Sequence, residues 1–308
     1  MNKKTGRPLA KKNISRNYKK TRSVPHFYLV FVARLFLFLS VVTALHIPQS
    51  FAKKEISLSK KDGGSPTPLT LYGDWSSDKC RSTVIMSHGL GGSHEAFSPY
   101  AKAMAKAGYR IVIMDHGEKD RGHILRVLFK SDPGSVLREE KRWNRRFQDL
   151  DATYRFATRY CRPEKLILAG HSMGAAIAML EAGAKGLVNY GGQDRFDAYI
   201  ALSPQGIGWI FESGAWEGIK KPVLMITGTK DKTLGKSYKT RLEAFTQMPN
   251  GHKRLVVIGG ADHLNIGGRA NEQTQNLIAN IIIEFLEDYR LTPLPESQYA
   301  TQAQITDK

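Results

Sequence analysis

The stretch Leu166-Ile-Leu-Ala-Gly-His-Ser-Met-Gly174 decides the interpretation of this chain. An apolar run with the length of a buried β-strand leads into Gly170-His-Ser-Met-Gly174, and a helical run rich in small residues, 175–180, follows. Strand, G-x-S-x-G and helix in this order are typical of a tight turn that presents a nucleophilic serine. The two glycines allow the strand and the helix to approach closely. Ser172 is therefore the candidate nucleophile, and the alternative is an ordinary glycine-rich turn.

Strand and helix patterns alternate outward from this turn, beginning at Leu69. The other expected strands are short apolar runs bounded by turn residues, at 69–72, 83–86, 110–114, 198–202, 223–227 and 255–258. Helices are expected over 98–108, along the face of Phe147, Leu150, Tyr154 and Ala157, and near 277–285. The alternation predicts an α/β fold with a mostly parallel central sheet and helices on both faces. The loops 117–145 and 204–221 are too short for a large cap domain.

The charge of the chain is concentrated at its start. The chain has 308 residues, enough for one large α/β domain, and a net charge of +18. Ten Lys or Arg residues and no acidic residue lie in the first 52, and subtracting these ten leaves +8 for the rest. That surplus is spread among acidic residues, without a basic stripe interleaved with aromatic residues. A solvated surface explains it, so nucleic-acid binding is rejected as the main function.

Residues 1–52 have the features of a secretory signal peptide. A basic start, an apolar stretch over 27–45 and the small-residue ending Ser50-Phe-Ala52 follow one another. The apolar stretch is also about long enough to cross a bilayer, so an uncleaved membrane anchor is the alternative. Arg34 and Pro48 favour cleavage after Ala52. The expected location is therefore outside the cytoplasm, periplasmic or secreted.

Three segments follow the signal peptide in the expected domain organisation. A polar lead-in over 53–68 has room for one short edge strand, and the catalytic domain spans 69–290. Residues 291–308 form a C-terminal tail, which we expect to be frayed from 296 onward because two prolines, Pro293 and Pro295, precede it.

A nucleophilic serine needs a base to take its proton and an acid to orient that base. Loops after later strands supply both in a right-handed α/β sheet, and Asp231 and His263 each follow such a strand. The chain order Ser172, Asp231, His263 is the one expected for a catalytic triad in this architecture.

Each partner has competitors in the sequence. His171 is the strongest competing histidine, but it is expected to pack beside the sheet because the turn directs neighbouring side chains differently. Asp262 adjoins the candidate base, and Asp197 lies before a strand, at the wrong edge of the sheet. The remaining histidines on loops that could border the site are His88, His94, His116 and His123.

Two backbone N–H groups are needed where negative charge develops on the substrate oxygen. The residue after the serine, Met173, supplies one. The second is expected from the glycine-rich loop Ser87-His-Gly-Leu-Gly-Gly92, most plausibly from Leu90. The alternative for this loop is a turn that only leads into the next helix, and both can hold at once.

Together these motifs resemble the α/β-hydrolase superfamily over about residues 69–290. The segments Ser87–Ser93, Asp115-His116 and Pro222–Asp231 resemble its dienelactone-hydrolase-like branch, which is similar to platelet-activating-factor acetylhydrolases and cutinase-type polyesterases. True dienelactone hydrolases carry a cysteine at the turn, where this chain has Ser172. The resemblance implies a serine hydrolase that cleaves carboxylic esters, an esterase or lipase-like enzyme, through an acyl-enzyme, and the signal segment adds that it is exported.

The same machinery could cleave amides, thioesters or lactones, and a catalytically silent binding protein of the same fold is the alternative from another class. The expected substrate is a small-molecule or lipid ester, with membrane contact only through an uncleaved anchor. The loops 117–145 and 204–221 could border the site, and Trp209 and Trp216 could line an acyl pocket or plug the core. No metal-ligand spacing or dinucleotide fingerprint occurs, so no cofactor is implied.

Cys80 and Cys161 are the only cysteines, and a disulfide between them is expected. In an α/β-hydrolase sheet, the strand before the glycine-rich loop and the strand before the serine are parallel neighbours, so both cysteines fall near the same edge. Adjacent strands are about 4.8 Å apart, which a disulfide can bridge. The alternative is two free buried thiols.

Overall fold

A computed structural model of the protein describes residues 53–59, 65–76, 81–118, 133–159, 162–232, 234–288 and 302–308. The signal segment, His123, Cys80 and Cys161 lie outside these ranges, so the disulfide stays a prediction. Within the described part of the chain, no helix has the length and apolar character needed to cross a bilayer.

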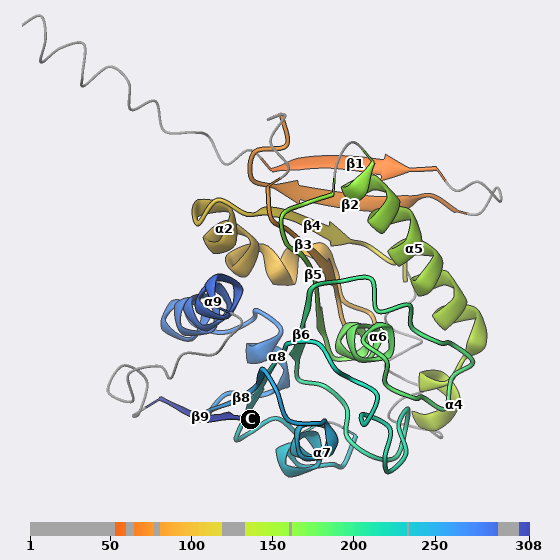
Figure 1. The fold of residues 1–308 in the computed structure, drawn as a ribbon, viewed down its shortest axis with the longest axis vertical. Helices are drawn as coiled ribbons and strands as arrows, with labels where there is room; N and C mark the ends of the chain where they lie inside the picture. The colour runs from red at the N-terminus through yellow and green to blue at the C-terminus, as the bar shows by residue number, and fades with distance from the viewer. Residues whose placement is uncertain are drawn as a thin grey trace, which may run out of the picture. The chain divides into compact units, whose positions relative to one another are not determined.

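The described residues build one nine-stranded sheet in the order β1-β2-β4-β3-β5-β6-β7-β8-β9 (Figure 1). The strands are β1 Lys54–Leu58, β2 Thr67–Tyr72, β3 Thr83–Ser87, β4 Arg110–Met114, β5 Leu166–His171, β6 Ala198–Leu202, β7 Val223–Gly228, β8 Lys253–Ile258 and β9 Ala303–Asp307. Neighbours from β4 to β8 pair in parallel, whereas the pairs β1–β2, β2–β4 and β8–β9 are antiparallel. The predicted mostly parallel sheet is confirmed.

Helices cover both faces of the sheet, as predicted. One face carries η1 His94–Phe97, α2 Ser98–Lys106, α8 His263–Ile266 and α9 Glu272–Glu287. The other carries α4 Pro133–Leu137, α5 Glu140–Thr158, α6 Met173–Glu181, η2 Tyr238–Arg241 and α7 Leu242–Gln247. Successive strand side chains point to opposite faces, so Val84 joins the first core and Ile85 the second.

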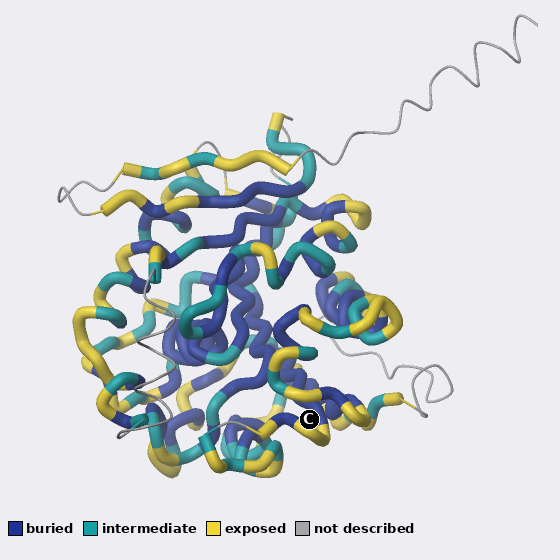
Figure 2. The backbone as a smooth tube through the Cα atoms, turned by 180° about the vertical axis from the view of Figure 1, so that it is seen from behind, coloured by how far each residue is buried: buried dark blue, intermediate teal, exposed yellow. Residues whose placement is uncertain are grey.

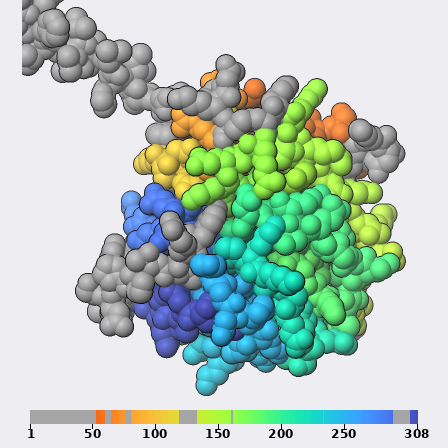
Figure 3. Space-filling model, in the orientation of Figure 1, coloured from red at the N-terminus to blue at the C-terminus, as the bar shows by residue number. Residues whose placement is uncertain are grey.

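The central strands are buried along their whole length because helices lie on both sides of them (Figure 2). The small residues of α6 let this helix lie fully buried against β5. On the surface, the guanidinium of Arg138, just after α4, donates to the backbone oxygen of Trp209 at 3.4 Å. The segment around α4 therefore meets the segment after β6 on the face shown in Figure 3.

The edge strand β1 was predicted from the sequence, whereas the edge strand β9 was not. The short edge strand allowed for in the lead-in exists as β1. The expectation of a frayed tail is wrong for Ala303–Asp307, which forms β9 against β8. Arg254 of β8 is buried and forms a 2.8 Å ion pair with Asp307. Pairing the open edge of β8 satisfies its backbone groups, which explains why so polar a segment is held.

Candidate active site

The candidate nucleophile lies on a strained turn between β5 and α6. Ser172 has φ 53° and ψ −117°, a conformation that residues with a side chain rarely adopt. Its backbone N–H donates to the oxygen of Leu202 on the neighbouring strand β6 at 2.9 Å. The turn is therefore fixed to the sheet, and strain of this kind is concentrated at functional sites.

The two glycines of the turn are required by close backbone contacts. A Cβ atom on Gly174 would lie 1.9 Å from the backbone oxygen of Ser87, and one on Gly170 would lie 2.1 Å from that of Gly174. Neither position has room for any side chain. The close approach of strand and helix expected from the sequence is present.

Asp231 and His263 meet at the carboxyl ends of β7 and β8. Nδ1 of His263 lies 2.9 Å from Oδ1 of Asp231, and since the carboxylate can only accept, Nδ1 carries the hydrogen. The other carboxylate oxygen accepts from the Thr227 hydroxyl at 2.9 Å. Burial alone would raise the pKa of Asp231, but its contacts with His263 and Arg241 lower it to about 2. Asp231 is therefore an ionised, buried partner for the imidazole.

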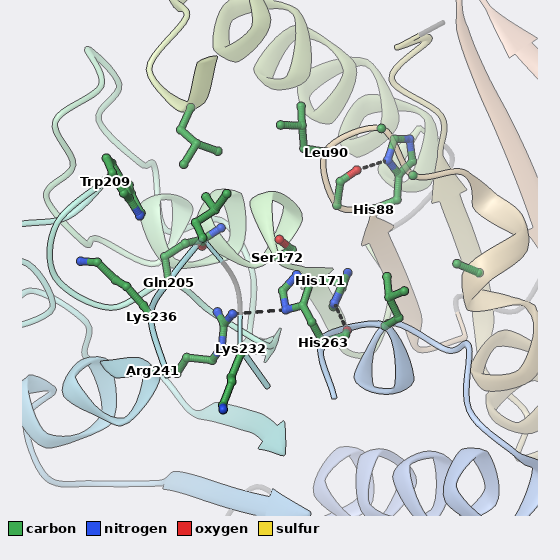
Figure 4. Close-up of a pocket in the computed structure, with 18 of the residues that line it drawn as sticks. His88, Leu90, His171, Ser172, Gln205, Trp209, Lys232, Lys236, Arg241 and His263 are labelled. Carbon is green, nitrogen blue, oxygen red and sulfur yellow. Dashed lines mark hydrogen bonds between the residues drawn. The ribbon is translucent and has the colours of Figure 1, made fainter. Parts of the chain in front are cut away.

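A cavity of about 570 Å³ opens beside these residues and is lined by both Ser172 and His263. Figure 4 shows the Ser172 hydroxyl and the His263 ring facing the same space. Asp231 is not among the lining residues and lies behind the ring. A substrate in the cavity can thus reach the serine and the base, while the acid stays dry.

The glycine-rich loop after β3 lies against the serine. A Cβ atom on Gly89 would be 3.2 Å from the Cβ of Ser172, closer than an ordinary contact, so a larger residue here would push the loop and the serine apart. Leu90 borders the cavity, and Met173 occupies the first position of α6, where a backbone N–H has no partner within the helix. Of the two residues expected to donate to an oxyanion, Met173 follows Ser172 directly and Leu90 lines the same cavity.

Comparisons with known proteins agree with this architecture. A family model described as serine aminopeptidase, S33, matches residues 78–206, which is less than half of the chain. A protein from Klebsiella pneumoniae named as a dienelactone hydrolase superposes with a TM-score of 0.56 at 18% identity, over 77% of this chain and 99% of that one. Dienelactone hydrolase from Anabaena variabilis gives 0.51 at 20% identity, over 76% and 98%. The chain has the α/β-hydrolase fold. No curated protein sequence matches it.

His171, the strongest competing histidine, is buried at the end of β5 and also borders the cavity, while Asp231 bonds to His263. His171 lines the cavity, its Nε2 donates to the backbone oxygen of His263 at 2.9 Å, and the two rings lie 4.6 Å apart. Burial and the nearby His263 hold the pKa of His171 well below its usual range, so it stays neutral. Its ring therefore supports the start of α8, where the candidate base lies.

Arg241 is a member of the site that the sequence did not single out. Its Nη2 lies 2.9 Å from Oδ1 of Asp231 and 3.3 Å from Nδ1 of His263. Nδ1 of His263 carries a hydrogen and donates to Asp231, so it cannot accept one from Nη2. The favourable contact of Arg241 is therefore with the Asp231 carboxylate. Nη1 donates to the backbone oxygens of Ser203 and Pro204 at 3.1 and 2.8 Å. Arg241 thus joins the acid to the segment after β6.

The two tryptophans proposed for the pocket lie in different environments in the structure. Trp209 lines the cavity, and the ammonium of Lys236 lies 5.7 Å from its ring centre. Trp216 is fully buried and packs on Phe211 with ring centres 5.0 Å apart. The pocket role for Trp216 is wrong, because this part of 204–221 fills the core next to α6.

His116 does not border the cavity but belongs to a second chain of polar groups that is fully buried. Its Nδ1 donates to Asp149 at 2.9 Å, and its Nε2 accepts from the Ser87 hydroxyl at 2.9 Å. Burial and the nearby charge of Arg146 lower the pKa of His116 to about 3, so the ring is neutral. The side chains of His116 and Asp149 have no exposed surface, so this serine–histidine–aspartate series cannot meet a substrate and ties α5 to the sheet.

Proposed function

We propose that this protein is a serine hydrolase of carboxylic esters that works through an acyl-enzyme. The observation that carries the proposal is the hydrogen-bonded pair of His263 and Asp231 beside Ser172, which lies on a strained turn and lines the same cavity. A serine hydroxyl is a weak nucleophile by itself, and an adjacent oriented base is what activates it.

In the proposed reaction, Oγ of Ser172 attacks the ester carbonyl carbon and its proton passes to Nε2 of His263. Asp231 holds the imidazole by Nδ1 and stabilises its positive charge. The N–H groups of Leu90 and Met173 donate to the oxyanion. His263 then protonates the departing alkoxide. Water, activated by the same ring, attacks the acyl-enzyme and releases the acid.

The cavity supports esters with short to medium acyl chains or exposed ester groups, because no long insertion among the described residues covers it. The solved relatives named as dienelactone hydrolases favour esters and lactones, whereas the matched family model bears the name of an aminopeptidase. Amide cleavage is therefore the second candidate reaction. It uses the same residues, with His263 protonating an amine in place of an alkoxide.

Covalent capture of the protein tests the proposal directly. A fluorophosphonate should label the folded protein at one site, and mass spectrometry should locate the adduct on Ser172. Protein unfolded in urea is the control and should not react. A folded protein that neither takes up the probe nor cleaves short-chain p-nitrophenyl esters would instead be the silent binding protein of this fold.

The cavity is also electrostatically one-sided, which predicts a preference for anionic esters. Lysine and arginine line it at four positions, and none of its described lining residues is acidic. Figure 4 places Arg241 and Lys236 on one side of Ser172 and His88 on the other. Arg241 is neutralised by Asp231, which leaves Lys232, Lys236 and Arg269 to attract an anion.

We expect an ester with a carboxylate on its acyl group to be cleaved with a kcat/KM several-fold above that of its neutral analogue. Lys232→Gln should reduce this ratio about 3-fold, the size of one exposed charge contact. Lys230→Gln, an exposed lysine outside the cavity, is the matched control and should leave the ratio unchanged. Measuring both at low and high salt checks the cause, since a ratio insensitive to salt is not electrostatic.

We also propose that the protein is exported, because residues 1–52 have the features of a secretory signal peptide. Sequencing the N-terminus of the mature protein from its native compartment decides between cleavage after Ala52 and an uncleaved anchor. Titrating thiols in the denatured, unreduced protein tests the Cys80–Cys161 bridge, which two free thiols would refute.

A further inference from the structure

A buried ion pair outside the cavity contacts the loop that carries Leu90. Arg146 on α5 has no exposed side-chain surface, and its Nε lies 2.8 Å from Oε1 of Glu118, whose side chain is 7% exposed. Burial would raise the pKa of Glu118, but Arg146 and a backbone N–H lower it to about 2, so the pair is charged. Neither residue lines the cavity.

Both members of the pair hold backbone atoms of the loop. The Arg146 guanidinium donates from Nη1 to the oxygen of His88 at 2.8 Å and from Nη2 to that of Gly89 at 3.2 Å. The other carboxylate oxygen of Glu118 accepts from the N–H of Gly91 at 2.8 Å. Residues on both sides of Leu90 are thus attached to one ion pair by charge-assisted bonds, which are stronger than neutral ones.

These bonds determine the direction of the peptide group between Gly89 and Leu90. The Gly89 oxygen also accepts from Nδ1 of His88 at 2.7 Å and from the N–H of Gly92 at 3.0 Å, so it faces the interior. A trans peptide is planar, and its N–H points away from its C=O. The Leu90 N–H therefore faces away from Arg146, and the loop lies against Ser172.

We propose that Arg146 and Glu118 are positioning residues that hold the Leu90 N–H toward the reacting oxygen. This inference rests on the proposed function. Stability alone does not explain the ion pair, because two apolar residues of similar volume at these positions would give a fold that is about as stable. Positioning of the Leu90 N–H does explain it. Glycines at 89, 91 and 92 make the loop flexible by themselves, and the pair limits that freedom before a substrate arrives.

The double variant Glu118→Gln/Arg146→Gln tests the proposal without leaving a buried charge unpaired. Glutamine has the shape of glutamate and, although it is shorter than arginine, the double variant carries no charge at either position, so the folded protein should survive. Loss of the fork should let the peptide group rotate and weaken one oxyanion donor. Since one such donor is worth about 10²–10³ in kcat, we expect kcat for a p-nitrophenyl ester to fall roughly 30- to 300-fold with KM changed less than 3-fold. Fluorophosphonate labelling should slow by a similar factor.

The control is Glu181→Gln/Arg195→Gln, which removes a largely buried ion pair outside the cavity and leaves Asp151, the other partner of Arg195, in contact with solvent. It should leave kcat unchanged even where the melting temperature moves. Arg146→Lys, which keeps the charge but not the fork, should fall between wild type and the double variant. A folded double variant with wild-type kcat would overturn the positioning role while the serine chemistry stands. A wild-type protein that the probe does not label would overturn the proposed function instead.

Discussion

Replacing Ser172 by alanine should lower kcat for p-nitrophenyl esters by about 10⁴-fold or more, which is the range found when a triad serine is removed. The reason is chemical, because Ser172 and His263 line the same cavity, whereas the hydroxyl of Thr240, the other one among its described lining residues, donates to the backbone oxygen of Ser237. Covalent labelling by a fluorophosphonate should disappear with the activity. The residual rate reflects binding and the two backbone donors, which the substitution leaves in place.

The fold should survive this substitution. The backbone N–H of residue 172 still donates to Leu202, and the alanine keeps the Cβ atom that the turn already accommodates. Circular dichroism and the melting temperature should therefore stay near wild type. Ser98→Ala, which removes a partly buried hydroxyl bonded to Tyr72, is the control that should retain full activity. Retained labelling of the Ser172→Ala protein would assign the chemistry to another residue.

The order of elements around Ser172 was predictable because each is encoded locally. Buried parallel strands are continuous apolar runs, and glycines on both sides of a serine indicate a close strand–helix approach. Because β5, β7 and β8 run parallel, their carboxyl ends lie at one edge of the sheet. Ser172, Asp231 and His263 follow these ends and therefore lie in one region. That placement needs only the chain order.

The polar partners of these residues could not be predicted because they depend on packing between distant segments. Arg241 meets Asp231 only once η2 packs across the end of β7, and nothing in its local sequence distinguishes it from other surface arginines. Arg146 lies on a helix face whose pattern indicated only Phe147 and its apolar neighbours. A buried ion pair produces no periodic pattern in the sequence from which it could be predicted.

The corrections have the same origin. Trp209 and Trp216 lie seven residues apart in the segment 204–221. Which of them enters the core depends on how this segment packs over α6, and the local sequence does not determine that. The strand β9 consists mainly of polar residues, so its composition indicates a tail. It is ordered by the open edge of β8, and the sequence carries no sign of which segment will occupy that edge.

Asp231→Asn should lower kcat by roughly 10³- to 10⁴-fold while Ser172 stays in place. The amide can present an N–H to Nδ1 of His263, which then acts as acceptor and leaves the hydrogen on Nε2. A ring in that tautomer cannot take the proton of the serine. The matched control is Asp262→Asn, since Asp262 adjoins the histidine but caps α8 and faces solvent, and asparagine caps a helix equally well.

The unfolding free energies of wild type and Asp231→Asn should depend differently on pH. Measuring them shows whether the variant loses activity because His263 is misoriented or because the protein unfolds. The pKa of Asp231 is lowered to about 2 in the folded protein, below its ordinary 3.8. Its ionised form therefore stabilises the fold at pH values above about 4, and this contribution is lost as the pH falls toward 2. Wild type should lose more unfolding free energy than Asp231→Asn across this interval. At pH 7 the variant should be the less stable protein, because Arg241 is left buried without its counter-charge. A folded Asp231→Asn protein with wild-type kcat at pH 7 would show that another group orients the base.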